Sequence, residues 1–228
     1  MGTFIFAGAS SAIAQSTAHK LMSSGHQVIG LSRNGDFDIY SENYKVENYN
    51  SNSLPQIEGP IDGLVYFPGT INLKPFHRIT QEEFLNDFEI NVQGAIASIQ
   101  KYLPNLKLSN NPSVVLFSSV AARTGMPFHA SIGLSKGAIE SLTKSLASEY
   151  APNIRFNAIA PSLTQTPLSE KFISSAEKLE ASRQRNPMKK VGQPSEIAEA
   201  VCFLLTNATW MTGEILHIDG GLSATRSI

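Results

Sequence analysis

Apolar residues follow two alternating patterns along the chain. Short apolar runs bounded by turn residues predict strands buried on both faces, at 4–7, 27–31, 63–67, 114–117, 155–159 and 215–218. Between them, apolar side chains recur every three or four residues, as at Val92, Ile96, Ile99 and Leu103, which predicts helices with one apolar face. Strands that alternate with helices are typical of a doubly wound sheet. We therefore expect an α/β domain with a mostly parallel sheet of six or seven strands and helices on both faces.

Two helices have clear starting points. A turn at Gly8 leads into a helix expected from Ala12 to Ser24, and Pro194 lies in the first turn of the segment PSEIAEAVCFLL. The stretch 34–60 has little helical periodicity and is short for a crossover between parallel strands, so we expect one or two truncated helices there. Because the chain has no repeat, low-complexity tract or linker, we expect a single domain over 1–228.

Composition narrows the class of protein. The 228 residues are 42% hydrophobic and carry a net charge of -1, enough for one buried core and without the basic surplus of a nucleic-acid or membrane-surface protein. The single cysteine, Cys202 in AVCFLL, is expected to be a buried helical thiol rather than a nucleophile or ligand, and no metal is expected. The apolar start lacks a positive n-region, and no run approaches the ~18 apolar residues of a membrane span. We expect a cytoplasmic protein without membrane or nucleic-acid partners.

The first strand is followed directly by the turn GASSAIA. A helix N-terminus after a tight turn presents free backbone N–H groups and a partial positive charge, which suit a pyrophosphate. The usual dinucleotide fingerprint has glycine at two positions where this chain has Ala12 and Ala14, so a helix start capped by serine is the alternative interpretation. The candidate cofactor contacts in this turn are Gly8, Ser10, Ser11 and Ile13.

The second strand ends in Leu31-Ser32-Arg33-Asn34. An acidic residue here would bind both ribose hydroxyls of NAD, whereas the hydroxyl of Ser32 and the guanidinium of Arg33 fit a 2′-phosphate. The sequence therefore predicts NADP(H) in preference to NAD(H). The alternative is an ordinary surface arginine at a strand end.

Several separated motifs, in the same order, resemble the short-chain dehydrogenase/reductase family over nearly the whole chain. GASSAIA is similar to its glycine-rich turn, and residues 66–69 lie where it has Asn-Asn-Ala-Gly. The family's asparagine, serine and lysine lie in segments that are matched here by FEINVQGA, FSSVAA and SIGLSKGA. Its nicotinamide loop is similar to APSLTQT, and its final strand is similar to WMTGEILHIDGG. By this resemblance the further candidate cofactor contacts are Phe67, Pro68, Gly69, Asn91, Lys136, Pro161, Thr164 and Thr166.

The resemblance also implies an architecture and an activity. It implies a Rossmann-like three-layer αβα fold, and hydride transfer between NADP(H) and a small carbonyl, alcohol or activated alkene. It implies a homodimer or homotetramer, paired through helices that begin near Phe84 and Ile132. Residues 164–192 take the place of the family's substrate-covering loop, and their excess of Lys over Glu indicates either an anionic ligand or a solvated helix face.

One catalytic position departs from the family. The resemblance gives Ser119 the role of orienting the substrate, Lys136 that of holding the nicotinamide ribose, and Asn91 that of keeping a water in the proton relay. The family's tyrosine lies thirteen residues after this serine and four before this lysine, where the chain has Ile132. Isoleucine cannot transfer a proton, and general acid/base catalysis contributes ~10²- to 10⁴-fold.

Two nearby residues have side chains able to carry a proton. His129 has an imidazole, which is the commonest general acid or base in enzymes, and the alternative interpretation is a partly exposed loop histidine. Tyr66 lies at the carboxyl end of a predicted strand, on the edge of the sheet where the site is expected. The alternative interpretation is an aromatic side chain packed within the strand. Two functions stay open: an oxidoreductase that uses another proton donor or water, and an inactive NAD(P)-binding protein acting as a sensor or partner subunit.

Overall fold

The protein is built around one parallel sheet of seven strands. The computed structural model describes residues 1–34 and 38–225, and within them the strands have the order β3-β2-β1-β4-β5-β6-β7. The chain winds outward from β1 through β2 to β3, then returns to the other side of β1 with β4, so the direction of winding reverses between β1 and β4. The strands are β1 Thr3–Ala7, β2 Gln27–Ser32, β3 Glu42–Lys45, β4 Gly63–Tyr66, β5 Ser113–Phe117, β6 Arg155–Pro161 and β7 Ile215–Ile218. This confirms the predicted doubly wound α/β fold.

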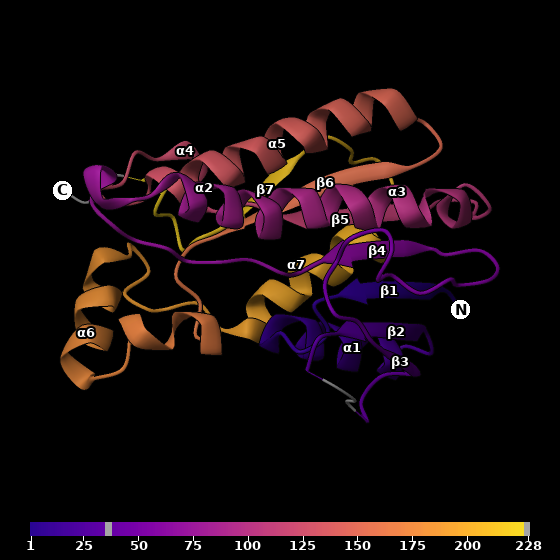
Figure 1. Cartoon of the computed structure of the whole chain (residues 1–228). Coiled ribbons are helices and arrows are strands. Elements are labelled where there is room, and N and C mark those ends of the chain that lie inside the picture. Colours follow the sequence, from indigo (N-terminus) through magenta and orange to yellow (C-terminus); the bar gives the residue numbers. More distant parts are fainter. Residues whose placement is uncertain (35–37, 226–228) are drawn as a thin grey trace.

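Helices cover both faces of the sheet and complete three layers (Figure 1). Helices α1 and α7 pack together on one face, and α2, α3 and α5 lie on the other. The alternation of side chains along β1 shows why two cores form, because Phe4 and Phe6 pack towards α1 and α7 while Ile5 and Ala7 pack towards α3 and α5. The α-helices are α1 Ala12–Ser23, α2 Gln81–Phe88, α3 Gly94–Leu106, α4 Val120–Arg123, α5 Ala130–Tyr150, α6 Ala176–Arg185 and α7 Pro194–Thr206, and shorter turns are η1 Phe76–Arg78, η2 Glu89–Gln93 and η3 Pro167–Phe172.

The expectation of truncated helices in 34–60 was wrong. The described part of that stretch contains turns and the short strand β3, which pairs in parallel with β2 from Ile29–Glu42 to Ser32–Lys45. The sequence ENYK has no apolar run because β3 is an edge strand with largely exposed residues, so the pattern of buried strands could not reveal it. Residues 35–37 lie outside the described part of the chain.

The other element boundaries lie close to those predicted. Helix α1 begins at Ala12 and ends one residue earlier than expected, and α7 begins at Pro194. Cys202 lies on α7 but is half-buried rather than fully buried, and burial raises the pKa of its thiol to about 11. Among the described helices, none is both long and apolar enough to cross a membrane.

Candidate functional site

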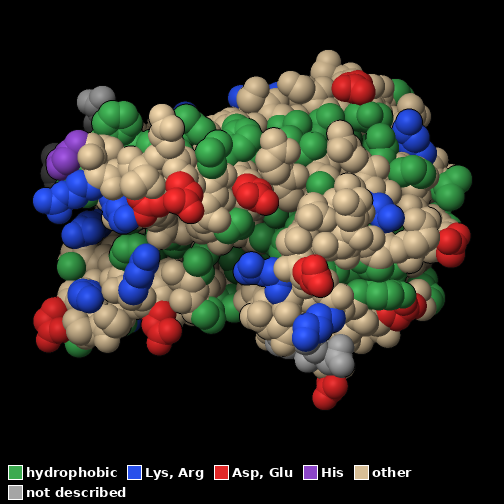
Figure 2. Space-filling model, in the orientation of Figure 1, with side chains coloured by type: hydrophobic (Ala, Val, Ile, Leu, Met, Phe, Trp, Pro, Cys, Tyr) green, Lys and Arg blue, Asp and Glu red, His purple; other side chains and the backbone are tan. Residues whose placement is uncertain are grey.

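A large cavity of about 1050 Å³ opens at the carboxyl ends of the central strands. It lies where the winding reverses, which is the place where open α/β sheets bind ligands. Figure 2 shows the cleft between the α6 segment and the rest of this face. The cavity brings together most of the sequence-predicted residues: Gly8, Ser10, Ser11, Ile13, Arg33, Tyr66, Phe67, Pro68, Gly69, Ser119, His129, Lys136, Pro161, Thr164 and Thr166 all line it. Ser32 and Asn91 are buried behind the lining.

The turn after β1 has the backbone geometry that suits a phosphate group. Gly8 has φ +83°, and a Cβ atom there would lie only 2.8 Å from Cδ of Pro68, so another residue would be strained and would clash. Ser11 is the N-cap of α1, yet its side chain makes no capping hydrogen bond. The structure therefore does not support the alternative interpretation, in which the side chain of this serine caps the helix. The alanines at 12 and 14 need no positive φ, because both belong to the regular α-helix.

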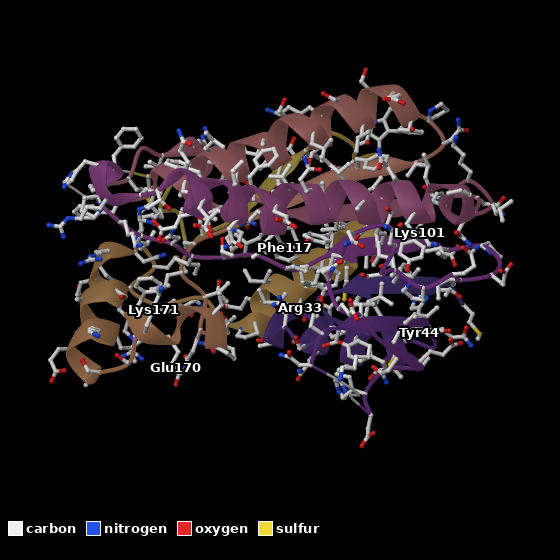
Figure 3. The ribbon with its side chains drawn as sticks, viewed as in Figure 1. Arg33, Tyr44, Lys101, Phe117, Glu170 and Lys171 are labelled. Carbon is white, nitrogen blue, oxygen red and sulfur yellow. The ribbon has the colours of Figure 1, made fainter. Side chains whose placement is uncertain are left out.

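The end of β2 presents one cation to the cavity. Arg33 is exposed and lines the cavity together with Asn34, Asn48 and Tyr49. In Figure 3 it lies between the sheet and the η3–α6 segment. The hydroxyl of Ser32 instead accepts a hydrogen bond from the backbone N–H of Asn34 at 3.2 Å, inside the strand end. Of the two residues predicted to bind a 2′-phosphate, only Arg33 reaches the cavity.

Lys136 lies on α5 with its ammonium group at the carboxyl end of β5. Its Nζ donates to the carbonyl oxygen of Phe117 at 2.9 Å, and the residue is only 7% exposed. Burial lowers the pKa of this lysine from 10.5 to about 8. A charged group held in a buried wall of the cavity is typical of a binding position rather than of a solvated helix face.

Asn91 lies beside Lys136 because the helix that carries it is locally widened. It belongs to the π-turn η2, between α2 and α3, and π-turns are frequent at functional sites. Gly69 separates the two side chains: a Cβ atom placed on that glycine would lie 3.2 Å from Oδ1 of Asn91 and 3.4 Å from Nζ of Lys136. The amide oxygen and the ammonium group therefore converge on the same point behind the cavity wall.

Ser119 is the N-cap of the short helix α4. Its Oγ accepts a hydrogen bond from the backbone N–H of Ala121 at 3.2 Å, and the residue lines the cavity. The hydroxyl therefore has a local structural role and still faces the space that a substrate would occupy. Ile132, one helical turn before Lys136, also lines the cavity and is 4% exposed.

The two side chains considered as replacement proton donors differ in geometry. The Tyr66 hydroxyl donates to the backbone carbonyl of Ile90 at 2.7 Å, its ring packs edge-on against Tyr49, and burial raises its pKa. This is the packed strand aromatic. His129 is half-exposed at the N-cap of α5 and lines the cavity, and its Nδ1 lies 2.7 Å from the carbonyl oxygen of Pro127.

Sequence reasoning missed a buried polar cluster behind Asn91. Its members are the buried Asp87 and Ser131 and the half-buried Thr70, which also lines the cavity; the hydroxyls of Thr70 and Ser131 each donate to the Asp87 carboxylate at 2.6 Å. The signal in the sequence was an acidic residue near the end of an amphipathic helix, which resembles an ordinary exposed position until the packing of α2 on α5 is known.

The segment 164–192 forms a flap over the cavity. A bridge between Thr164 and Gly192 closes its base, and η3 and α6 lie within it. Lys178 and Lys189 make local contacts, as when Lys189 donates to the carbonyl oxygen of Gln184 at 2.9 Å, whereas Lys171 reaches across to the carbonyl oxygen of Ile71 at 3.2 Å. Arg185 and Lys190 line the cavity, and Lys190 pairs with Glu196. Some of the basic side chains of this segment therefore face solvent, and others face the cavity.

Comparison with known proteins identifies the family. A family model described as enoyl-(acyl carrier protein) reductase matches residues 38–223. A tropinone reductase homolog from Arabidopsis thaliana is 36% identical over 170 residues, which cover 74% of this chain and 55% of that protein. The chain belongs to the short-chain dehydrogenase/reductase family. It spans only part of such curated relatives, including 63% of a tropinone reductase homolog from Datura stramonium to which it is 36% identical.

Solved structures of short-chain dehydrogenases match over the whole length. The ligand-free aldohexose dehydrogenase of Thermoplasma acidophilum is 29% identical with a TM-score of 0.91, and the match covers 100% of this chain and 96% of that chain. ElxO with NADP bound is 23% identical with a TM-score of 0.89, covering 99% and 100% of the two chains, and it shows a shared fold.

Proposed function

We propose that this short-chain dehydrogenase/reductase binds NADP(H) in the large cavity and reduces or oxidises a small carbonyl, alcohol or activated alkene without a tyrosine proton donor. The observation that carries the proposal is a cavity lined by Lys136, Ser119 and the Gly8 turn, with Asn91 buried directly behind its wall. The residues fit the cofactor because the Gly8 turn leads to the N-terminus of α1 at the cavity wall, and because Lys136 supplies a buried cation. When bound, NADPH supplies the hydride.

The preference for NADP(H) rests on Arg33. Its guanidinium is able to form paired, charge-assisted hydrogen bonds with a phosphate, and Asn34 beside it also lines the cavity. The occurrence of NADP in the structure of ElxO, which has the same fold, supports a nicotinamide cofactor here. The Gly8 turn and the first amides of α1 would hold the pyrophosphate, and Lys136 would hold the ribose next to the nicotinamide.

The protein groups then divide the chemistry between them. Ser119 would orient the substrate oxygen, since its hydroxyl lines the cavity. The Lys136 ammonium group would stabilise the developing negative charge, and the amide oxygen of Asn91 would accept a hydrogen bond from the water of the proton relay. The proton would come from His129 or from water, since Ile132 has no proton to give and the Tyr66 hydroxyl is already donated to Ile90.

The alternative function is a cofactor-binding protein without turnover, acting as a sensor or as the partner of an active subunit. The observation that favours it is Ile132, which places an apolar side chain at the cavity wall where the family has its acid. In either function we propose a cytoplasmic homodimer or homotetramer, paired through the faces of α2 and α5 that leave Leu85 and Leu134 exposed.

Two measurements test the proposal. Titration calorimetry with NADPH and NADH should show binding of both, with NADPH at least ten times tighter. A screen of ketones, enones and quinones should then show NADPH oxidation above the rate in buffer for at least one compound. Binding without turnover across the screen would refute the oxidoreductase and support the sensor, and the absence of any nucleotide binding would refute both.

A further inference from the structure

The buried carboxylate of Asp87 lies behind the candidate catalytic residues and takes no part in the chemistry described above. It is 2% exposed, and it accepts one hydrogen bond from the Thr70 hydroxyl and one from the Ser131 hydroxyl, each of 2.6 Å. These three residues come from α2, from the segment after β4 and from the first turn of α5. A buried carboxylate is costly unless hydrogen bonds compensate it, so these two donors hold it in place.

The Thr70 hydroxyl connects Asp87 to Asn91. Because a hydroxyl has one proton, and Thr70 donates it to Asp87, only the lone pairs of Oγ1 remain for another partner. Nδ2 of Asn91 donates to Oγ1 of Thr70 at 2.8 Å and to the backbone carbonyl of Asp87 at 2.7 Å. Both amide protons of Asn91 are therefore used on the side of α2.

The position of the Asn91 amide nitrogen decides where its oxygen lies. Oδ1 is on the opposite side, where it accepts a hydrogen bond from the backbone N–H of Thr70 at 3.4 Å, and it borders the same point beside Gly69 as the ammonium group of Lys136. Asn91 is 1% exposed, so water cannot replace a lost partner easily. Anything that removes the acceptor at Thr70 leaves one amide proton unsatisfied and loosens the side chain.

We propose that Asp87 is a positioning residue, which acts through Thr70 to hold the Asn91 carbonyl oxygen toward Lys136. This inference rests on the proposed function, because it assigns a purpose to a residue behind that site. It has no counterpart among the residues predicted from the sequence. Asp87 touches neither the cavity nor a reacting atom, and its effect reaches the site along one chain of hydrogen bonds.

The ammonium group of Lys136 reports whether the chain is intact. An acceptor dipole beside an ammonium group favours its charged form, so a loosened Asn91 should lower the pKa of Lys136 below its present value of about 8. The other charged residues on the elements around this lysine are Glu82, Glu83 and Asp87 of α2, Glu89 of η2, Arg123 of α4, and Glu140, Lys144 and Glu149 of α5. Asp87→Asn also removes a charge, so the decisive variant is Thr70→Val, which changes none.

The test is an NMR titration of the native protein without ligand, labelled with ¹³C-lysine, with the Lys136 signal assigned from Lys136→Met. Thr70→Val and Asp87→Asn should each lower the pKa of Lys136 by half a unit or more, about a threefold change in proton affinity. Thr70→Ser keeps the hydroxyl and should restore the native value. Ser131→Ala is the matched control, because it removes a hydrogen bond of the same length to Asp87 that does not lead to Asn91.

Each outcome decides the proposal. An unchanged pKa of Lys136 in Thr70→Val would overturn the proposal and leave Asp87 with a structural role alone. So would a shift of this pKa in Ser131→Ala as large as that in Thr70→Val. If Asp87→Asn fails to fold, Thr70→Val and Thr70→Ser still give the answer. Because the readout needs no cofactor, a failure of this inference is distinguishable from a failure of the proposed function, which calorimetry with NADPH measures separately.

Discussion

If Ile132 takes the place of the family's tyrosine, as we propose, Ile132→Tyr should introduce a proton donor at the cavity wall. Ile132 lines the cavity one helical turn before Lys136, and residues four apart on a helix have Cβ atoms about 5–6 Å apart. A phenol at this position would thus extend into the 1050 Å³ cavity near a buried ammonium group, which favours its ionised form and lowers its pKa. General acid catalysis is worth ~10²- to 10⁴-fold, or about 2.7–5.4 kcal/mol of activation free energy.

The larger side chain also carries a cost in stability. Ile132 belongs to α5 and is 4% exposed, so a larger ring at this position has to displace its neighbours. Overpacking of this kind is expected to destabilise the fold by about 1–3 kcal/mol. The open side of the cavity should keep the cost at the lower end of this range. Urea denaturation of both proteins measures it, and the rates are compared only if both variants are folded.

The matched control is Ile132→Phe, which adds the same ring without the hydroxyl. The assay is NADPH oxidation, followed by absorbance against the panel of ketones, enones and quinones, at saturating cofactor. We expect Ile132→Tyr to exceed Ile132→Phe by at least a hundredfold with its best substrate. If both variants bind NADPH and Ile132→Tyr is no faster than Ile132→Phe, the assignment of Ile132 to the donor position is refuted. The native protein then separates the two proposed functions, since only the oxidoreductase oxidises NADPH faster than buffer does.

Three further predictions follow from individual side chains. Burial lowers the pKa of Lys136 to about 8 in the folded state, whereas its ordinary value is 10.5. Between these two pH values the unfolded chain binds a proton at this lysine that the folded chain has released. This group therefore makes the free energy of unfolding rise with pH across that window. Lys136→Met should abolish that rise in urea midpoints. It should also weaken NADPH binding about tenfold at pH 7 by calorimetry, and an unchanged affinity would contradict the assigned role. Arg33→Glu should reverse the cofactor preference, lowering the affinity for NADPH by ~10- to 100-fold relative to NADH; an unaltered ratio would show that Arg33 is a plain surface residue. Arg155 donates to the carbonyl oxygens of Leu204, Leu205 and Ala208 at the end of α7, so Arg155→Met should cost about 3 kcal/mol in denaturant unfolding without altering the affinity for NADPH at a temperature where it is folded.

The six buried strands and the turn after β1 could be predicted because local sequence encodes them. Buried parallel strands are apolar throughout, and β1 is followed directly by the Gly8 turn, so both are visible within a few residues. The assignment of Ile132 to the family's tyrosine position rests on the resemblance and stays a prediction. Strand β3 could not be predicted, because an edge strand with polar residues resembles a loop until its pairing with β2 is known.

Tertiary structure decided which of the candidate side chains face the cavity. Sequence left Tyr66 open as a proton donor, and only the packing of η2 against β4 commits its hydroxyl to Ile90. Sequence paired Ser32 with Arg33, but the turn at the end of β2 buries the serine and exposes the arginine. Asp87 lies far along the chain from Ser131, and their contact exists only because α2 packs on α5. Local patterns determined the family, the turn after β1 and the presence of an isoleucine at Ile132, whereas hydrogen bonds between distant segments determined which polar groups remain available in the cavity. Each donor or acceptor is used by whichever partner the fold brings to it.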